Sequence, residues 1–128
     1  EYYGYDDALY AGIRLIAASA RLGRSVTELR GAMRPMVNTP EMRFQVDEIR
    51  KFAAIGEIAE RIAASDAVAD TTDGVRVTTA DGWWLLRASN TQDVLVGRCG
   101  QQTEAGLERR KGQLRDALTA VGETPPDI

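Results

Sequence analysis

The chain has 128 residues, a mass of 14.0 kDa and a formal net charge of -3, and 44% of its residues are hydrophobic. This length fits one domain with part of another, and the hydrophobic content is that of a globular chain. The slight acidity argues against a general nucleic-acid binder, and no apolar run reaches the roughly 18 residues that a membrane span needs.

The residue types also limit the chemistry. The chain has no histidine, and Cys99 is its only cysteine. An internal disulfide, a Cys/His zinc site and histidine-based catalysis are therefore excluded. Because a lone cysteine fits a reducing compartment, we expect a cytoplasmic protein. Arginine outnumbers lysine fourteen to two, which favours an anionic ligand, since a guanidinium makes planar, bidentate contacts with anions.

Two short helices are predicted at the start of the chain. Asp6 or Asp7 can cap the first, whose apolar residues recur at helical spacing until Gly23. Ser25 and Glu28 have the spacing of a capping box for the second. Two such helices cannot bury a core alone, so we expect them to need further chain or to pack on the remainder.

Residues 35–40, with a proline at each end, are predicted to form a connector at a domain boundary. From Met42 onwards apolar and polar residues alternate, which predicts a half-buried strand. Asp47 can then cap a helix reaching about Ala64. Its expected buried stripe consists of Phe52, Ile55, Ile58 and Ile62.

Three further strands and a last helix follow. The strands are predicted over 75–79, 83–87 and 94–98, and Thr103 can cap the helix. Asp81-Gly82 is typical of a hairpin with a tight primed turn, which requires positive φ angles. The order predicts an α+β fold, with a four- to five-stranded, mostly antiparallel sheet and two helices on one face, preceded by the two short helices.

One loop concentrates groups that bind anions. Arg87-Ala88-Ser89-Asn90-Thr91 brings one guanidinium, two hydroxyls and one amide into five consecutive positions. The guanidinium can bind two phosphate oxygens, and free backbone N–H groups of a loop between strands would add an anion nest. Arg98 on the next strand could approach the same place. Ser, Asn and Thr are also ordinary turn residues, so composition alone leaves both interpretations open.

Several segments resemble one enzyme family in the right order. Residues 73–77, 81–83 and 86–91 resemble the C-terminal domain of the α-D-phosphohexomutases, with the nearest likeness to bacterial phosphomannomutase/phosphoglucomutase. Residues 4–10 resemble a helix start late in the third domain of that family, and 38–41 resemble the link to its fourth domain.

The resemblance implies a division of the chain. It makes residues 1–37 the incomplete end of the sugar-binding third domain and 38–41 a hinge formed by Asn38, Thr39 and Pro40. Residues 42–122 become the phosphate-binding domain, with a TATA-binding-protein-like β-α-β-β-β(β)-α order, and 123–128 become a tail.

The resemblance also implies a reaction. Such enzymes interconvert hexose 1-phosphates and 6-phosphates through a phosphoserine in the first domain and a sugar bisphosphate of the glucose 1,6-bisphosphate type. Mg²⁺ is held in the second domain. The fourth domain holds the phosphate that is not reacting, which assigns that task here to Arg87, Ser89, Asn90, Thr91 and, less directly, Arg98.

It follows that this chain alone has no catalytic or metal-binding residue and no mutase activity. Its expected partners are a mannose or glucose phosphate and the N-terminal domains of the same enzyme, with neither nucleic acid nor membrane.

Two departures from the family pattern keep other interpretations open. Gln92 and Asp93 occupy places where the family has a variable residue and then proline. Asp93 would weaken anion binding at low dielectric, unless it pairs with Arg98. One alternative is a small α+β binding module for RNA or a protein partner. The other is a relic domain that has kept the fold and lost phosphate binding.

Overall fold

The computed structural model describes residues 4–125, which divide into two compact units between Pro35 and Met36. No helix within 4–125 combines the length and the apolar character that crossing a membrane demands. Unit 1 comprises residues 1–35 and unit 2 comprises residues 36–128.

Unit 1 consists of two helices, α1 (Ala8–Leu22) and α2 (Val26–Gly31). The side chain of Asp7 accepts the N–H of Tyr10 at the start of α1, and Gly23 ends the helix in the left-handed conformation, with a φ of 61°. The predicted capping box at the start of α2 is present in both directions. Neither helix buries a residue, which agrees with the expectation that the pair has no core of its own.

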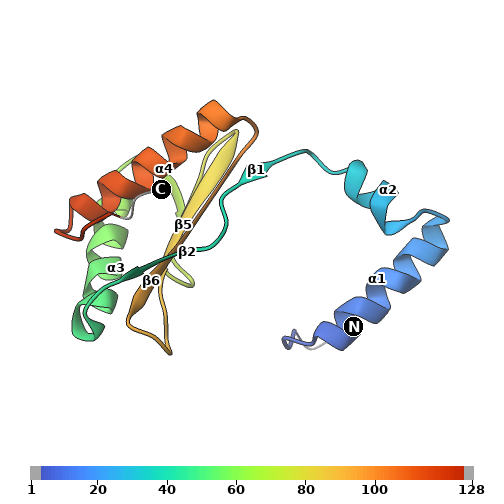
Figure 1. The fold of residues 1–128 in the computed structure, drawn as a ribbon, viewed down its shortest axis with the longest axis horizontal. Coiled ribbons are helices and arrows are strands. Elements are labelled where there is room, and N and C mark those ends of the chain that lie inside the picture. Colours follow the sequence, from blue (N-terminus) through green and yellow to red (C-terminus); the bar gives the residue numbers. More distant parts are fainter. Residues whose placement is uncertain (1–3, 126–128) are drawn as a thin grey trace. The chain divides into compact units, whose positions relative to one another are not determined.

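Unit 2 is an α+β domain, as predicted, and Figure 1 shows both of its helices on the same side of the sheet. Every strand pairing is antiparallel. The strand order is β1-β6-β5-β4-β3, and β2 pairs with β6 beyond the end of β1. Its elements in chain order are β1 (Val37–Asn38), β2 (Met42–Gln45), α3 (Glu48–Ala63), β3 (Val68–Asp70), β4 (Val75–Thr78), β5 (Gly82–Ala88), β6 (Val94–Gln101) and α4 (Glu104–Thr119).

The described sheet has six strands rather than four to five. The additional ones are β1, inside the predicted connector, and β3, a short edge strand whose residues are all exposed. β1 has two residues and β3 has three, which is too few for a strand pattern to be recognised in the sequence.

The core lies between the helices and one face of the sheet. Leu86 and Leu95 of the strands and Ile58, Leu114 and Leu118 of the helices are fully buried. The predicted stripe on α3 is wrong at Phe52, which is 55% exposed, while Ile55 and Ile62 are partly buried against the core. The helix is turned so that Lys51, Ala54 and Ile58 face inward.

The hairpin between β4 and β5 forms where it was predicted, but the turn is not a primed one. Among residues 4–125 only Gly4, Gly23, Gly74 and Gly122 have positive φ angles, so Gly82 does not. The Thr79 N–H donates to the Gly82 carbonyl at 2.8 Å. Glycine is required at 82 for another reason: a Cβ there would lie 2.5 Å from the Gly100 carbonyl oxygen on β6.

Candidate anion-binding site

The loop between β5 and β6 is folded around the hydroxyl group of Ser89. The Ser89 N–H donates to the Val94 carbonyl at 3.0 Å. The Ser89 Oγ atom, which is buried, accepts the N–H groups of Gln92 at 3.2 Å and of Thr91 at 3.4 Å. The predicted nest of free backbone N–H groups is therefore wrong, because three of these groups are bonded inside the loop. The donors that remain for a ligand are mainly side chains.

Those side chains lie at the end of β5. Asn90 and Thr91 are exposed, and the half-buried Arg87 points to the face of the sheet that the helices do not cover. The Arg87 Nη1 atom lies 4.0 Å from Asp73 Oδ2. The structure thus brings Arg87, Ser89, Asn90 and Thr91 to one edge of the sheet.

Gly74 lets the chain pass directly against Arg87. Its φ angle is 81°, and a Cβ there would lie 2.3 Å from the Leu86 carbonyl oxygen and 2.6 Å from the Arg87 Cβ. A side chain at 74 would therefore both strain the backbone and displace Arg87. The Asp73-Gly74 pair, noted in the sequence only as part of a resemblance, has a positioning function here.

The open face of the sheet carries four arginines, one from each of four strands. We call Arg43, Arg76, Arg87 and Arg98 the arginine face. Arg43 and Arg87 both lie opposite Val96, and Arg76 and Arg98 both lie opposite Leu85. The side chains therefore form two rows, and neighbours on the diagonal are on the order of 7–8 Å apart at their Cα atoms. An acidic protein thus gathers four of its arginines on one surface.

Besides Arg87, which lies near Asp73, two of these arginines have a partner. Arg43 donates to Glu41 and to the Gln92 side chain, both at 2.7 Å. The guanidinium of Arg76 lies 5.1 Å from the ring centre of Trp83, which is on this face, while Trp84 is buried in the core. Arg98 is exposed and has no ion-pair partner within 4.0 Å among the described residues.

A hollow lies beside this surface. Its volume is about 240 Å³, and it is lined by Asp70, Thr72, Asp73, Arg76, Leu85 and Arg87. The hollow can hold a small polar group next to the guanidinium groups of Arg76 and Arg87. The charges around it are mixed, because two carboxylates lie among the arginines.

The carboxylate of Asp93 does not pair with Arg98, contrary to our suggestion. Asp93 Oδ1 lies 3.6 Å from the Nζ atom of Lys51 on α3. The Lys51 side chain is only 2% exposed, and the apolar periodicity of the helix gave no reason to expect it in the interior. The available signal was its spacing, three residues before Ala54 and seven before Ile58, which places it on the same side of α3.

The residues of the predicted hinge lie at the other end of the domain. Asn38 belongs to β1 and lies opposite Gly100. Thr39 is buried; its N–H donates to the Cys99 carbonyl, and its hydroxyl accepts the Cys99 N–H, each at 3.0 Å. The exposed Pro40 follows. A hinge at 38–41 stays a prediction.

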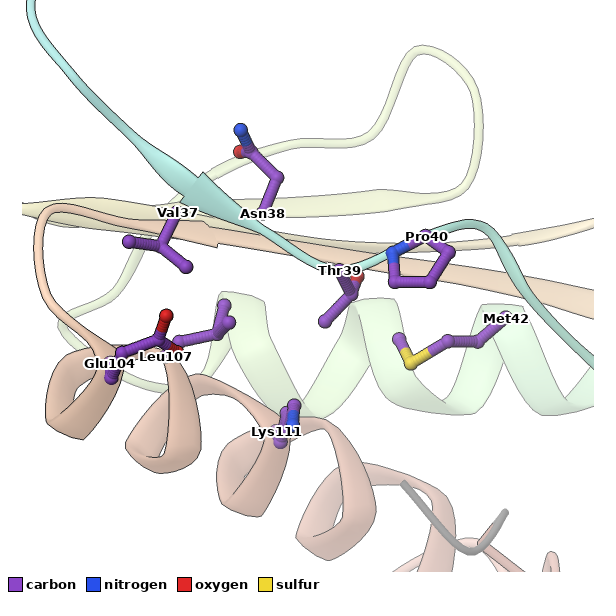
Figure 2. Close-up of a pocket in the computed structure, with 8 residues that line it drawn as sticks. All are labelled: Val37, Asn38, Thr39, Pro40, Met42, Glu104, Leu107 and Lys111. Carbon is purple, nitrogen blue, oxygen red and sulfur yellow. The ribbon is translucent and has the colours of Figure 1, made fainter.

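A second hollow, of about 350 Å³, separates this segment from α4. Figure 2 shows Val37 and Thr39 pointing toward Leu107 of α4, while Asn38 points away from it. The lining is mainly apolar, with Lys111 and Glu104 at its polar side. Among residues 4–125 no group of three or more Asp, Glu or Cys side chains is arranged to hold a metal ion.

Comparisons with known proteins agree on one family. The family described as "Phosphoglucomutase/phosphomannomutase, C-terminal domain" matches residues 41–117. The chain is 37% identical over 120 residues to a phosphomannomutase/phosphoglucomutase of Pseudomonas putida, covering 94% of this chain and 26% of that protein. It is 33% identical over 129 residues to a phosphoglucomutase of Neisseria meningitidis, covering 99% of this chain and 27% of that protein.

The fold gives the same result. A crystal structure of a phosphoglucomutase/phosphomannomutase family protein from Burkholderia thailandensis superposes with a TM-score of 0.74 at 32% identity, covering 98% of this chain and 26% of that one. The chain spans about a quarter of the length of the curated relatives that it matches. It therefore belongs to the phosphoglucomutase/phosphomannomutase family, which it matches over the C-terminal domain.

Proposed function

We propose that unit 2 binds the phosphate group of a hexose phosphate through Arg87, Ser89, Asn90 and Thr91, with Arg98 as an additional charge. The observation that carries this proposal is the arginine face, with the loop of residues 89–93 at its edge. A guanidinium and several hydroxyl and amide donors at one place are the groups that recognise a phosphate.

The role proposed for this site is binding and orientation. A phosphate held far from the reacting bond supplies binding energy that fixes the position of the sugar. Because these donors recognise the phosphate rather than the sugar, the same site can hold a sugar bound in either orientation. For the same reason it accepts mannose and glucose phosphates alike. The carboxylate of Asp93 is offset by Lys51, so it need not abolish anion binding.

The rest of the reaction is assigned to parts of the enzyme outside these 128 residues. These parts would supply the phosphoserine, the Mg²⁺ and the sugar-binding loop, and the reaction would pass through a sugar bisphosphate. Asn38, Thr39 and Pro40 would form the hinge that lets the phosphate-binding domain close and exclude water. The chain alone would then be inactive as a mutase, and we expect the enzyme in the cytoplasm.

An amide NMR titration of the chain with inorganic phosphate and with glucose 1-phosphate tests the site. An isolated grip of this kind should have a dissociation constant on the order of millimolar, or about 4 kcal/mol. Shifts should be confined to residues 87–91 and the neighbouring part of β6, and should be similar for both ligands. Arg87→Ala should abolish them, whereas Arg61→Ala, at an exposed position of α3, removes the same charge and should not.

Other outcomes point to the alternative functions. Absence of shifts at tens of millimolar ligand would favour a relic domain without phosphate binding. Shifts spread over the arginine face with an RNA oligonucleotide, and none with phosphate, would favour an RNA-binding module. Conversion of glucose 1-phosphate to glucose 6-phosphate by the pure chain would contradict its proposed inactivity.

A further inference from the structure

Lys51 is a buried cation directed at the loop of residues 89–93. It is one of only two lysines in the chain, and its side chain is 2% exposed. Its Nζ atom donates to the Gln92 carbonyl at 3.0 Å and lies 3.6 Å from Asp93 Oδ1 and 3.9 Å from Glu48 Oε1. A buried charge is costly unless it is paired and hydrogen-bonded, so these contacts account for its place in the interior.

Gln92, whose carbonyl accepts from Lys51, has two further hydrogen-bond partners. Arg43 on β2 donates from its Nη1 atom to the Gln92 side-chain oxygen at 2.7 Å. The Gln92 N–H donates to the Ser89 hydroxyl at 3.2 Å. Gln92 thus uses its carbonyl, its amide side chain and its N–H, and two of the three partners come from other elements of the fold. None of these partners is a ligand-binding group of the proposed site except Ser89.

We propose that Lys51 and Arg43 are positioning residues, which hold the loop of residues 89–93 in the shape that binds an anion. The inference rests on the proposed function. A loop that is already ordered pays less conformational entropy when it binds, so its affinity is higher than that of a mobile loop. Lys51 also balances the negative charge of Asp93, which would otherwise oppose an anionic ligand.

The test uses the complete 128-residue chain and a matched pair of variants, Lys51→Met and Lys111→Met. Each removes one lysine and one charge, but Lys111 lies on α4 and pairs with Glu108. The first readout needs no ligand: it is the hydrogen exchange of the Ser89, Thr91 and Gln92 amides, all of which are bonded within the loop. Lys51→Met should speed this exchange on the order of tenfold, the effect of one hydrogen bond to a charged group, and Lys111→Met should not.

The second readout is the dissociation constant for inorganic phosphate. Lys51→Met should raise it on the order of tenfold, and Lys111→Met should leave it unchanged. The exchange rates of the loop and the dissociation constant should change together in Lys51→Met, because the loop has lost a fixed contact. A raised dissociation constant with unchanged loop exchange would show that only the charge of Lys51 mattered and would overturn the positioning function.

A second variant guards against failure of Lys51→Met to fold. Gln92→Ala is at an exposed position and removes the bond from Arg43 without changing any charge. It should speed exchange at Ser89 and weaken phosphate binding by roughly threefold, as for a partly exposed hydrogen bond. Unchanged loop exchange in both variants would overturn the inference. If the natural chain bound no phosphate, the proposed function would fail, while hydrogen exchange would still decide whether Lys51 and Arg43 order the loop.

Discussion

The two faces of the sheet are built from the same strands and have opposite characters. Along β5, Trp84, Leu86 and Ala88 point into the core beneath α3 and α4. The two residues between them, Leu85 and Arg87, point to the open face, which carries the other arginines. Because successive side chains of a strand point to opposite faces, residues that stabilise the fold alternate along β5 with residues of the proposed binding surface. A substitution on one face should alter one property and spare the other.

The largest expected effect is on the covered face. Leu86 is fully buried, so Leu86→Ala should lower the free energy of unfolding by about 2–5 kcal/mol through lost contacts and a cavity. Leu85→Ala, one residue away on the open face, should cost clearly less. Urea unfolding of both variants measures the difference. Equal losses would mean that the open face is also covered by protein.

Gly74 is a position at which one substitution should change both the stability of the domain and its binding of phosphate. Gly74→Ala forces a residue with a side chain to a φ of 81° and places its Cβ against Arg87, so it should cost about 1–3 kcal/mol and also weaken phosphate binding. Gly112→Ala on α4 is the control. A Cβ there meets nothing within 4 Å, and the change should stabilise the helix by roughly 0.5–1 kcal/mol. If Gly74→Ala destabilised the chain without affecting binding, Gly74 would have no function in positioning Arg87.

A moderate effect is expected from Arg98 on the open face. Arg98→Ala should weaken phosphate binding by roughly threefold, less than the loss in Arg87→Ala, because Arg98 lies diagonally from Arg87. Its stability should stay within about 0.5 kcal/mol of the natural chain, as for an exposed residue. Calorimetry and the phosphate titration measure the two quantities. A loss equal to that of Arg87→Ala would make Arg98 a primary ligand.

The smallest expected effect is the alkylation of Cys99, which should be slow in the folded chain. Cys99 lies on the covered face, and burial raises the pKa of its thiol to about 11. Because the thiolate is the reactive form, iodoacetamide at pH 8 should label native Cys99 slowly and urea-unfolded Cys99 completely, as measured by mass spectrometry. Rapid labelling of the native chain would show that the covered face opens readily.

Local signals in the sequence predicted most of the helices correctly. Asp7, Ser25, Asp47 and Thr103 each cap the helix that was expected to follow, because a cap depends on residues only two or three positions away. The α+β class and the two helices on one face of the sheet also followed from the sequence. Of the two strands that were missed, β1 depends on a distant partner, since Val37 pairs with Gln101, whereas β3 pairs with the nearby β4 and is only three residues long.

Arg87 and the Ser-Asn-Thr loop were singled out from the sequence, and they lie together at the end of β5. Their function in binding a phosphate stays a prediction, and the geometry of the loop was less predictable. The bonds from Thr91 and Gln92 to the Ser89 hydroxyl were not foreseen, because the same residue types serve a turn and an anion site. Lys51 was missed because burial of a lysine depends on the Gln92 carbonyl, 41 residues further along the chain.

The double attachment of Thr39 has a mechanical consequence. Its N–H and its hydroxyl are both bonded to Cys99 of β6, immediately after the β1 pairing. A pull on the chain at Met36 would therefore act on β6 through the two residues of β1 and the two bonds of Thr39. Because β1 lies at one edge of the sheet, this force would have to break the β1 pairing and both bonds of Thr39 before it reached the pairing of β2 with β6. Thr39 and the loop of residues 89–93 lie at opposite ends of β6, so a force applied at Met36 would reach that loop only along this strand.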